Sequence, residues 1–206
     1  YGEVAGITMR PRIWSWLWFL LGVIYFLLPL YATLQFSLKA RKGTLSLLAY
    51  ENVLADPRFI RTFVFSLEMA LISILVSVLL IVPTAYWVHL RLPRLRPVVE
   101  LVTLMPFVIP AVVLVFGLIR TYSRPPFTLV SSPVLLVAGY VVLSLPYMYR
   151  AVDTGLRSMD VVRLTEAAQS LGANWPTILL RVIFPNLRTA LLSGAFLTIA
   201  IVIGEF

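Results

Sequence analysis

Four polar side chains lie inside long apolar stretches of this sequence, where they could act on a passing solute. Glu68, Ser73 and Ser77 share one stretch, and Glu205 lies near the end of another. If such a stretch crosses a bilayer, an acidic residue near its centre costs about 2.5–3.5 kcal/mol on insertion scales. In a cavity of low dielectric constant, a carboxylate attracts a cation far more strongly than in water. These residues are candidates for a cation path; hydrogen bonding between helices, or contact with outer headgroups, is the alternative.

The residue types that most enzymes and metal sites need are scarce. The chain has no cysteine and a single histidine, His89, which excludes disulfides, thiolate sites and metal sites built on paired histidines. It has no phosphate loop of the form GxxxxGK followed by Ser or Thr, so the chain cannot hydrolyse ATP by that route. We expect no catalytic residues, metal or cofactor. His89 and Glu100 are predicted to be an interfacial side chain and a solvated charge at a helix end.

Composition excludes a soluble globular protein. Of the 206 residues, 60% are hydrophobic and 13% are charged, and the mean hydropathy is +0.95, whereas soluble domains are about 45–50% apolar and about 25% charged. The net charge of +8 comes from basic residues between the apolar runs. This placement indicates contact with anionic headgroups, not a nucleic-acid partner. Four tryptophans near the ends of predicted spans are expected to be interfacial anchors: Trp14, Trp16, Trp18 and Trp87.

Five apolar runs predict an all-α, polytopic membrane protein. Each has at least 20 residues, the length a helix needs to cross a bilayer, whereas a barrel strand would need about 9–11 of alternating polarity. The runs cover residues 13–36, 62–89, 98–121, 129–149 and 187–206. A cytoplasmic N-terminus places ten of the 17 basic residues inside and seven outside, a bias that favours this orientation. We expect about five spans here and six in the full protein.

The segment 150–188 is the long polar stretch between spans. A helix is predicted over 159–171, with Ser158 as its N-cap and Gly172 as the left-handed residue that ends it. Its predicted apolar stripe consists of Val161, Leu164, Ala168 and Leu171. A second short helix is predicted to begin near Pro176, capped by Asn174, and to end at Pro185.

Small residues on the first of these helices favour contact with another protein. Ala167, Ala168 and Gly172 stand where a helix lying on the membrane surface would carry Leu or Phe. Small side chains let another backbone approach closely, which suits a partner's groove. The alternative is an amphipathic connector that rests on the headgroups.

The motif in this segment resembles the EAA loop of ABC importer permeases, the membrane components of binding-protein-dependent transport systems. Glu166-Ala167-Ala168, Gly172 four residues later, and Ile183-Phe184-Pro185 carry the resemblance. Three further segments are similar to the spermidine/putrescine-like branch, which also includes iron, thiamine and phosphonate systems: Leu145-Pro146-Tyr147, Leu171-Gly172-Ala173 and Gly204-Glu205-Phe206.

The resemblance implies a type I importer fold in the inner membrane of a prokaryote. Residues 1–206 would form one permease domain, with 150–188 as its cytoplasmic loop. The implied partners are a cytoplasmic ATPase dimer, a like or identical second permease, a solute-binding protein outside the membrane, and lipid. The implied coupling residues are Glu166, Ala167, Ala168, Gly172 and Pro185. A polyamine-type solute comes first, ahead of iron, thiamine or phosphonate.

Two other classes of protein fit the composition. An intramembrane or lipid-modifying enzyme would need Asp, His or Ser clustered within the spans, and these residues are scattered. A secondary transporter should show an inverted repeat and broken helices, and neither is evident in the sequence.

Overall fold

The computed structural model describes residues 13–39, 45–126, 128–130 and 132–204, and these are helical almost throughout. The chain divides into two compact units, Tyr1–Arg61 and Thr62–Phe206. In the first unit, α1 (Ile13–Ser37) and α2 (Leu48–Ala55) are joined by a hydrogen bond of 2.7 Å between the hydroxyls of Ser37 and Tyr50. Nearly every described side chain of α1 is exposed and apolar, which a helix in water could not sustain.

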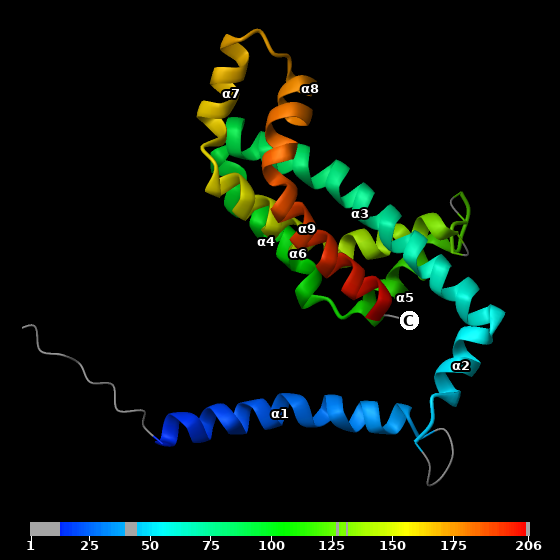
Figure 1. Ribbon diagram of the computed structural model, residues 1–206. Helices are drawn as coiled ribbons and strands as arrows, with labels where there is room; N and C mark the ends of the chain where they lie inside the picture. Colours follow the sequence, from blue (N-terminus) through cyan, green and yellow to red (C-terminus); the bar gives the residue numbers. More distant parts are fainter. Residues whose placement is uncertain (1–12, 40–44, 127, 131, 205–206) are drawn as a thin grey trace, which may run out of the picture. The chain divides into compact units, whose positions relative to one another are not determined.

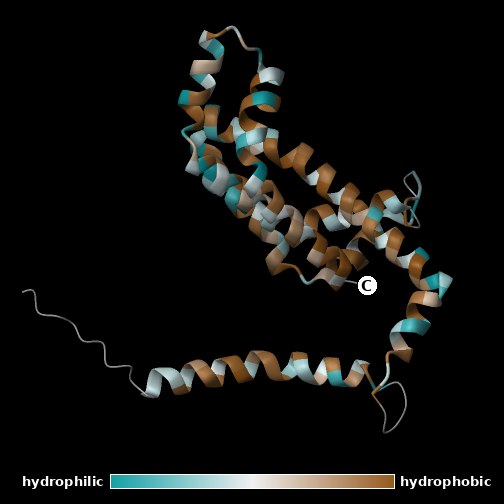
Figure 2. Ribbon diagram, in the orientation of Figure 1, coloured by the Kyte–Doolittle hydropathy of each residue, from teal (hydrophilic) through white to brown (hydrophobic). Residues whose placement is uncertain are grey.

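The second unit contains the other helices (Figure 1). In order they are α3 (Pro57–Arg91, from Thr62 onward), η1 (Pro93–Leu95), α4 (Arg96–Val108), α5 (Ala111–Tyr122), α6 (Pro133–Ser158), α7 (Val161–Ser170), α8 (Trp175–Thr177), the π-helical turn η2 (Ile178–Ile183) and α9 (Phe184–Gly204). Figure 2 shows hydrophobic residues along the long helices and more hydrophilic ones on α7.

Four helices are long and apolar enough to span a membrane: Trp14–Ser37, Pro57–Arg91, Pro133–Ser158 and Trp175–Gly204. This confirms the all-α, polytopic class. The run predicted over 98–121 is divided between α4 and α5, which are bent by 96° where they meet; counted as one broken span, this pair is the fifth candidate. Ile109 is extended, with φ −93° and ψ 116°, as the residue before Pro110 tends to be, since the proline ring disfavours the helical conformation there. This broken pair also contradicts the expectation that no helix is broken.

The structure also shortens the polar segment at both ends. The helix α6 continues nine residues beyond the predicted end at Tyr149, because Val152 and Leu156 keep a buried stripe facing the core. The last helix begins at Trp175, not at Leu187. The connection between the two long helices is therefore α7 with short turns on either side.

The core lies where α6 packs against α9 (Figure 1). Met148, Leu187 and Ile183 are fully buried here. Two glycines permit the close approach: a Cβ on Gly155 would lie 2.8 Å from the Cβ of Ala190, and one on Gly194 would lie 2.7 Å from the sulfur of Met148. A side chain at Gly155 would push the two helices apart, because the Ala190 Cβ is fixed to its backbone, whereas one at Gly194 would require the Met148 side chain to shift.

Gly155→Ala should therefore destabilise the protein by about 1–3 kcal/mol, because the Ala190 methyl is held by its own helix and cannot move aside. The matched control is Gly117→Ala in α5, where no atom lies within 4 Å of the added methyl and helix propensity improves by roughly 1 kcal/mol. Thermal unfolding in detergent, followed by the helical circular dichroism signal, compares the two. Equal midpoints would show that α6 and α9 do not need this contact.

Candidate functional site

Helix α7 is capped at its N-terminus by Asp160, whose Oδ1 accepts a hydrogen bond of 3.3 Å from the backbone N–H of Arg163. The prediction of Ser158 as the cap is wrong. Because α6 runs through Ser158, its hydroxyl instead donates to the carbonyl of Gly155 at 2.8 Å. Two residues therefore separate α6 from α7, and the direction of the chain changes over this short distance.

The predicted end of α7 at Gly172 is confirmed. Gly172 has φ +79°, a conformation that residues with a side chain rarely adopt. Its N–H donates to the carbonyl of Gln169 at 2.9 Å, and the N–H of Ala173 donates to that of Ala168 at 3.0 Å. These two bonds form a Schellman motif, which satisfies carbonyls that the helix end would otherwise leave open. The turn after α7 is thus defined by hydrogen bonds.

The inner face of α7 consists of Val161, Thr165 and Ala168, which are all buried. The predicted stripe is correct for Val161 and Ala168 but wrong for Leu171, which is 89% exposed. Leu171 follows the last helical turn, and a 3.6-residue repeat places it beyond Leu164, at the margin of the buried face. We define the docking face as five of the exposed residues at this end of α7: Glu166, Ala167, Ser170, Leu171 and Gly172.

A buried hydrogen bond ties α7 to the end of α3. The hydroxyls of Tyr86 and Thr165 are 2.8 Å apart. Since the Thr165 hydroxyl already donates to the carbonyl of Val161 at 2.7 Å, Tyr86 is the donor in this pair. The Tyr86 ring also packs edge-on against Trp175 of α8, with centroids 6.1 Å apart. Tyr86 of α3 therefore contacts both α7 and α8, which are the first and second arms of the loop.

The second arm begins as predicted but does not end as predicted. Asn174 caps α8 by accepting from the N–H of Thr177 at 3.0 Å. The helix then continues through Pro185 to Gly204, so the predicted end at Pro185 is wrong. Proline lacks an N–H and its ring clashes with the carbonyl four residues earlier in a regular α-helix. The wider π-helical turn at 178–183 precedes Pro185 and accommodates it. Pro185 itself is exposed.

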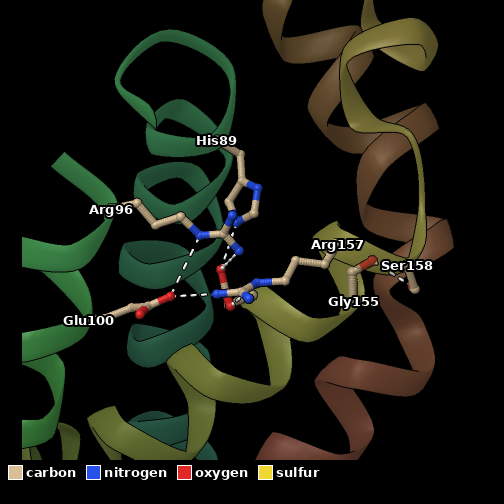
Figure 3. Close-up of polar contacts among 7 residues, drawn as sticks. His89, Arg96, Glu100, Gly155, Arg157 and Ser158 are labelled. Carbon is tan, nitrogen blue, oxygen red and sulfur yellow. Dashed lines mark hydrogen bonds and ion pairs between the residues drawn. The ribbon is translucent and has the colours of Figure 1, made fainter. Parts of the chain in front are cut away.

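A cluster of charged residues lies where the C-terminal ends of α3 and α6 meet the N-terminal end of α4 (Figure 3). Its centre is Asp153 of α6, which is 6% exposed. One carboxylate oxygen lies 2.7 Å from His89 Nε2 and 3.1 Å from Arg96 Nη2, and the other lies 2.8 Å from Arg157 Nε. Glu100 pairs with Arg157 and lies 3.6 Å from Arg96 Nε. We call these five residues the charged cluster.

The charged cluster corrects two predictions. His89 has a side chain that is 8% exposed and is paired with Asp153, so it is not merely interfacial. Glu100 is half-buried between two arginines, so it is not a solvated end charge. The spacings Asp153–Arg157 and Arg96–Glu100, each four residues, were a readable signal for pairs along one helix. The contacts between helices had no such signal.

A polar cavity of about 340 Å³ lies beside the charged cluster, between α4 and α6. Thr103, Tyr149 and Arg150 line it together with Glu100, Asp153 and Arg157. The buried hydroxyl of Tyr149 has no hydrogen-bond partner among the described residues. A polar cavity of this size can hold ordered water, which would satisfy that hydroxyl.

The candidates for a solute path lie in different environments. Ser73 and Ser77 are fully buried on the side of α3 that faces α6, and the hydroxyl of Ser77 is 3.5 Å from that of Ser144. Glu68 is exposed on the opposite side of α3, the side that carries Leu75 and Leu79. The structure therefore does not bring Glu68 together with the two serines. Glu205 lies outside the described residues.

Metal ligands do not cluster in the part of the chain that the structure describes: it contains no group of three or more His, Asp or Glu residues that could hold an ion.

Comparison with known proteins identifies relatives of this chain. The family described as "Binding-protein-dependent transport system inner membrane component" matches residues 77–206. The spermidine/putrescine transport system permease protein PotB of Escherichia coli is 27% identical over 169 residues, which cover 74% of this chain and 61% of that protein. The chain thus spans about three fifths of the length of that relative.

Two other relatives carry different names. A probable molybdenum ABC transporter permease protein of Haloferax volcanii is 29% identical, covering 98% of this chain and 75% of that protein. A probable sulfate transport system permease protein of Nephroselmis olivacea is also 29% identical, covering 100% of this chain and 75% of that protein.

The charged cluster predicts an asymmetry between two aspartates. Asp153→Asn leaves two arginines without their buried counter-charge and should cost on the order of 3 kcal/mol. The control Asp160→Asn removes an exposed ion pair with Arg163 but keeps a side chain that can cap α7, so it should cost less than about 1 kcal/mol. Thermal unfolding in detergent measures both. A similar small loss in the two variants would mean that the cluster does not hold α3, α4 and α6 together.

Proposed function

Because this chain belongs to the family of binding-protein-dependent transport system inner membrane components, we propose that it is the permease subunit of an ATP-driven importer of a small polar solute. Its multiple apolar spans agree with an inner-membrane location. Members of the family are transport subunits and not enzymes, and a separate ATPase hydrolyses ATP. The proposal concerns how this chain receives that energy and what it moves.

The observation that carries the proposal is the docking face at the end of α7. It presents the acidic Glu166, the small Ala167 and the exposed Leu171 beside a turn with defined hydrogen bonds. Apolar and small side chains are the means by which a short helix enters a groove of a partner. The partner is a cytoplasmic ATPase dimer, and the contact lies within residues 150–188, at the exposed end of α7, in a permease domain that extends over 1–206.

The contacts of α7 make it suitable for transmitting movement. It joins α6 through two residues, it is hydrogen-bonded to α3 through Tyr86, and it leads through α8 into α9. Movement of the ATPase against Glu166, Ala167 or Gly172 would therefore displace three spans together. Ala168 acts from the buried side, where its small size lets α7 lie close to the core. Pro185 acts through the π-helical turn that it accompanies.

The remaining partners follow from the family and from the exposed apolar helices. A second permease, like or identical, would cover part of the exposed apolar surface of the spans, and lipid would cover the rest. A solute-binding protein would deliver the solute from outside. These partners are shared by systems for different solutes, so they do not identify what is carried.

For the solute we propose a polyamine-type cation, with iron, thiamine and phosphonate as alternatives. The support is the match to a spermidine/putrescine permease and the two acidic residues Glu68 and Glu205 within apolar runs. The matches to proteins named for molybdenum and sulfate transport are of similar identity. An anionic solute is therefore the competing proposal, and the charge of the solute distinguishes the two.

The coupling role predicts the effect of Gly172→Val. A β-branched residue at φ +79° costs about 1–2 kcal/mol, and no atom of the chain lies within 4 Å of its Cβ, so the protein should still fold and reach the membrane. Uptake by the reconstituted importer should fall roughly tenfold, and stimulation of ATPase activity by the loaded binding protein should fall with it. Gly172→Asn is the matched control, because Asn tolerates this backbone conformation. Uptake by the Val variant equal to that of the Asn variant would contradict the coupling role.

The cation proposal predicts that charge matters at two positions. Glu68→Gln and Glu205→Gln keep the shape of each side chain but remove the charge, so at least one should lower spermidine uptake by roughly tenfold or more. Membrane levels of the protein and the basal ATPase activity should stay unchanged. Normal spermidine uptake in both variants would reject a cation path through these residues and favour an anionic or neutral solute.

A further inference from the structure

An apolar slot of about 360 Å³ separates the end of α3 from the second arm of the loop. Tyr86 and Trp87 form one wall, and Trp175, Leu179 and Leu180 form the other. The rings of Trp87 and Trp175 lie with centroids 5.4 Å apart. Trp87 is 46% exposed and Leu180 is 65% exposed. We call this feature the aromatic slot; it is open to the surroundings and none of its walls belongs to the charged cluster.

Arg91 borders the aromatic slot, and two further arginines follow slot residues closely in the sequence. The guanidinium of Arg91 lies 5.8 Å from the centre of the Trp175 ring, a cation–π contact. Arg94 follows three residues later in η1, and Arg181 follows Leu180 in η2. Unlike Arg96 and Arg157, these three make no ion pair with a carboxylate in the described ranges. Positive charge at the rim is thus available to an anionic group from outside the chain.

The aromatic slot is continuous with an exposed apolar face of α3. Leu80, Pro83 and Trp87 lie on one face of α3, at spacings of three and four residues, and all are exposed. Tryptophan and arginine together at the end of an apolar span are typical of the headgroup level, where the ring and the charge each find a suitable neighbour. An amphiphile with an apolar chain and an anionic head matches both parts of the feature.

We propose that the aromatic slot binds one acyl chain of an anionic phospholipid, whose phosphate lies against Arg91 and Arg94. A lipid is favoured over a protein segment because the slot continues an exposed apolar face of α3, because Arg91 lies at its edge, and because no acidic residue lines it. Clusters of basic residues beside a span attract anionic headgroups of the cytoplasmic leaflet. The bound lipid joins α3 to α8, the arm that leads into α9, and so supports the loop from its membrane side.

The tryptophans of the chain make this binding measurable. There are five, and replacing Trp14, Trp16 and Trp18 by Phe leaves only Trp87 and Trp175, both in the aromatic slot. The purified variant is placed in phosphatidylcholine vesicles with increasing fractions of brominated phosphatidylglycerol, and its fluorescence is recorded. Bromine quenches a tryptophan that touches the acyl chain. We expect quenching that saturates at a low lipid fraction, and much weaker quenching by brominated phosphatidylcholine.

Substitution of the rim separates specific binding from general contact with lipid. Arg91→Gln should shift the half-saturating fraction of phosphatidylglycerol about fivefold upward, as loss of one basic residue near an anionic surface does. The control Arg150→Gln removes an exposed charge that lines the other cavity and should leave the curve unchanged. Equal quenching by both lipids, or an unchanged curve for Arg91→Gln, would overturn the proposal. Absence of quenching by either lipid would overturn it too, since a protein surface would then cover the slot.

Discussion

The close packing of α6 against α9 is the contact on which the rest of the second unit depends. These two helices enter and leave the loop, so their separation sets where α7 and α8 can lie. Gly155 allows the two backbones to approach until a methyl group would no longer fit, and Gly194 makes room for the Met148 side chain. In a bilayer, lipid tails are as apolar as leucine, so association of spans relies on such close van der Waals contact between small residues. The packing therefore stabilises the core and also sets the positions of α7 and α8.

The charged cluster fixes how α3 and α4 are aligned along α6. Burying Asp153 is costly, and a buried ion pair seldom stabilises a protein more than apolar residues of the same size would. What it provides here is register: the carboxylate must meet His89 of α3, Arg96 of α4 and Arg157 of α6 at the same time. A shift of α3 or α4 along its axis by one turn would leave an unpaired charge in the core. Apolar packing alone would tolerate such a shift more easily.

Exposed apolar surface is the other consequence of this fold. Leucine, valine and phenylalanine side chains remain exposed along α3, α4, α5 and α9, which agrees with helices that meet lipid and further subunits. The docking face of α7 differs, because it combines a carboxylate, small residues and one exposed leucine. Helix α7 itself is joined to α3 by the hydrogen bond between Thr165 and Tyr86, and it follows α6 after two residues. The chain thus has exposed surfaces of two different compositions.

The sequence by itself determined the features that depend on neighbours along the chain. Long apolar runs predicted helical spans. Gly172 predicted where α7 ends, Asn174 predicted where α8 begins, and the EAA motif indicated the family. Each of these rests on backbone preferences or hydropathy within a few residues. Only the tertiary structure showed that Asp153 meets residues 57 and 64 positions away, that Leu171 is exposed, and that the helix continues through Pro185. Those outcomes depend on which helices pack together, because a buried charge, a buried face and a tolerated proline are each decided by the neighbours that folding brings from distant parts of the chain.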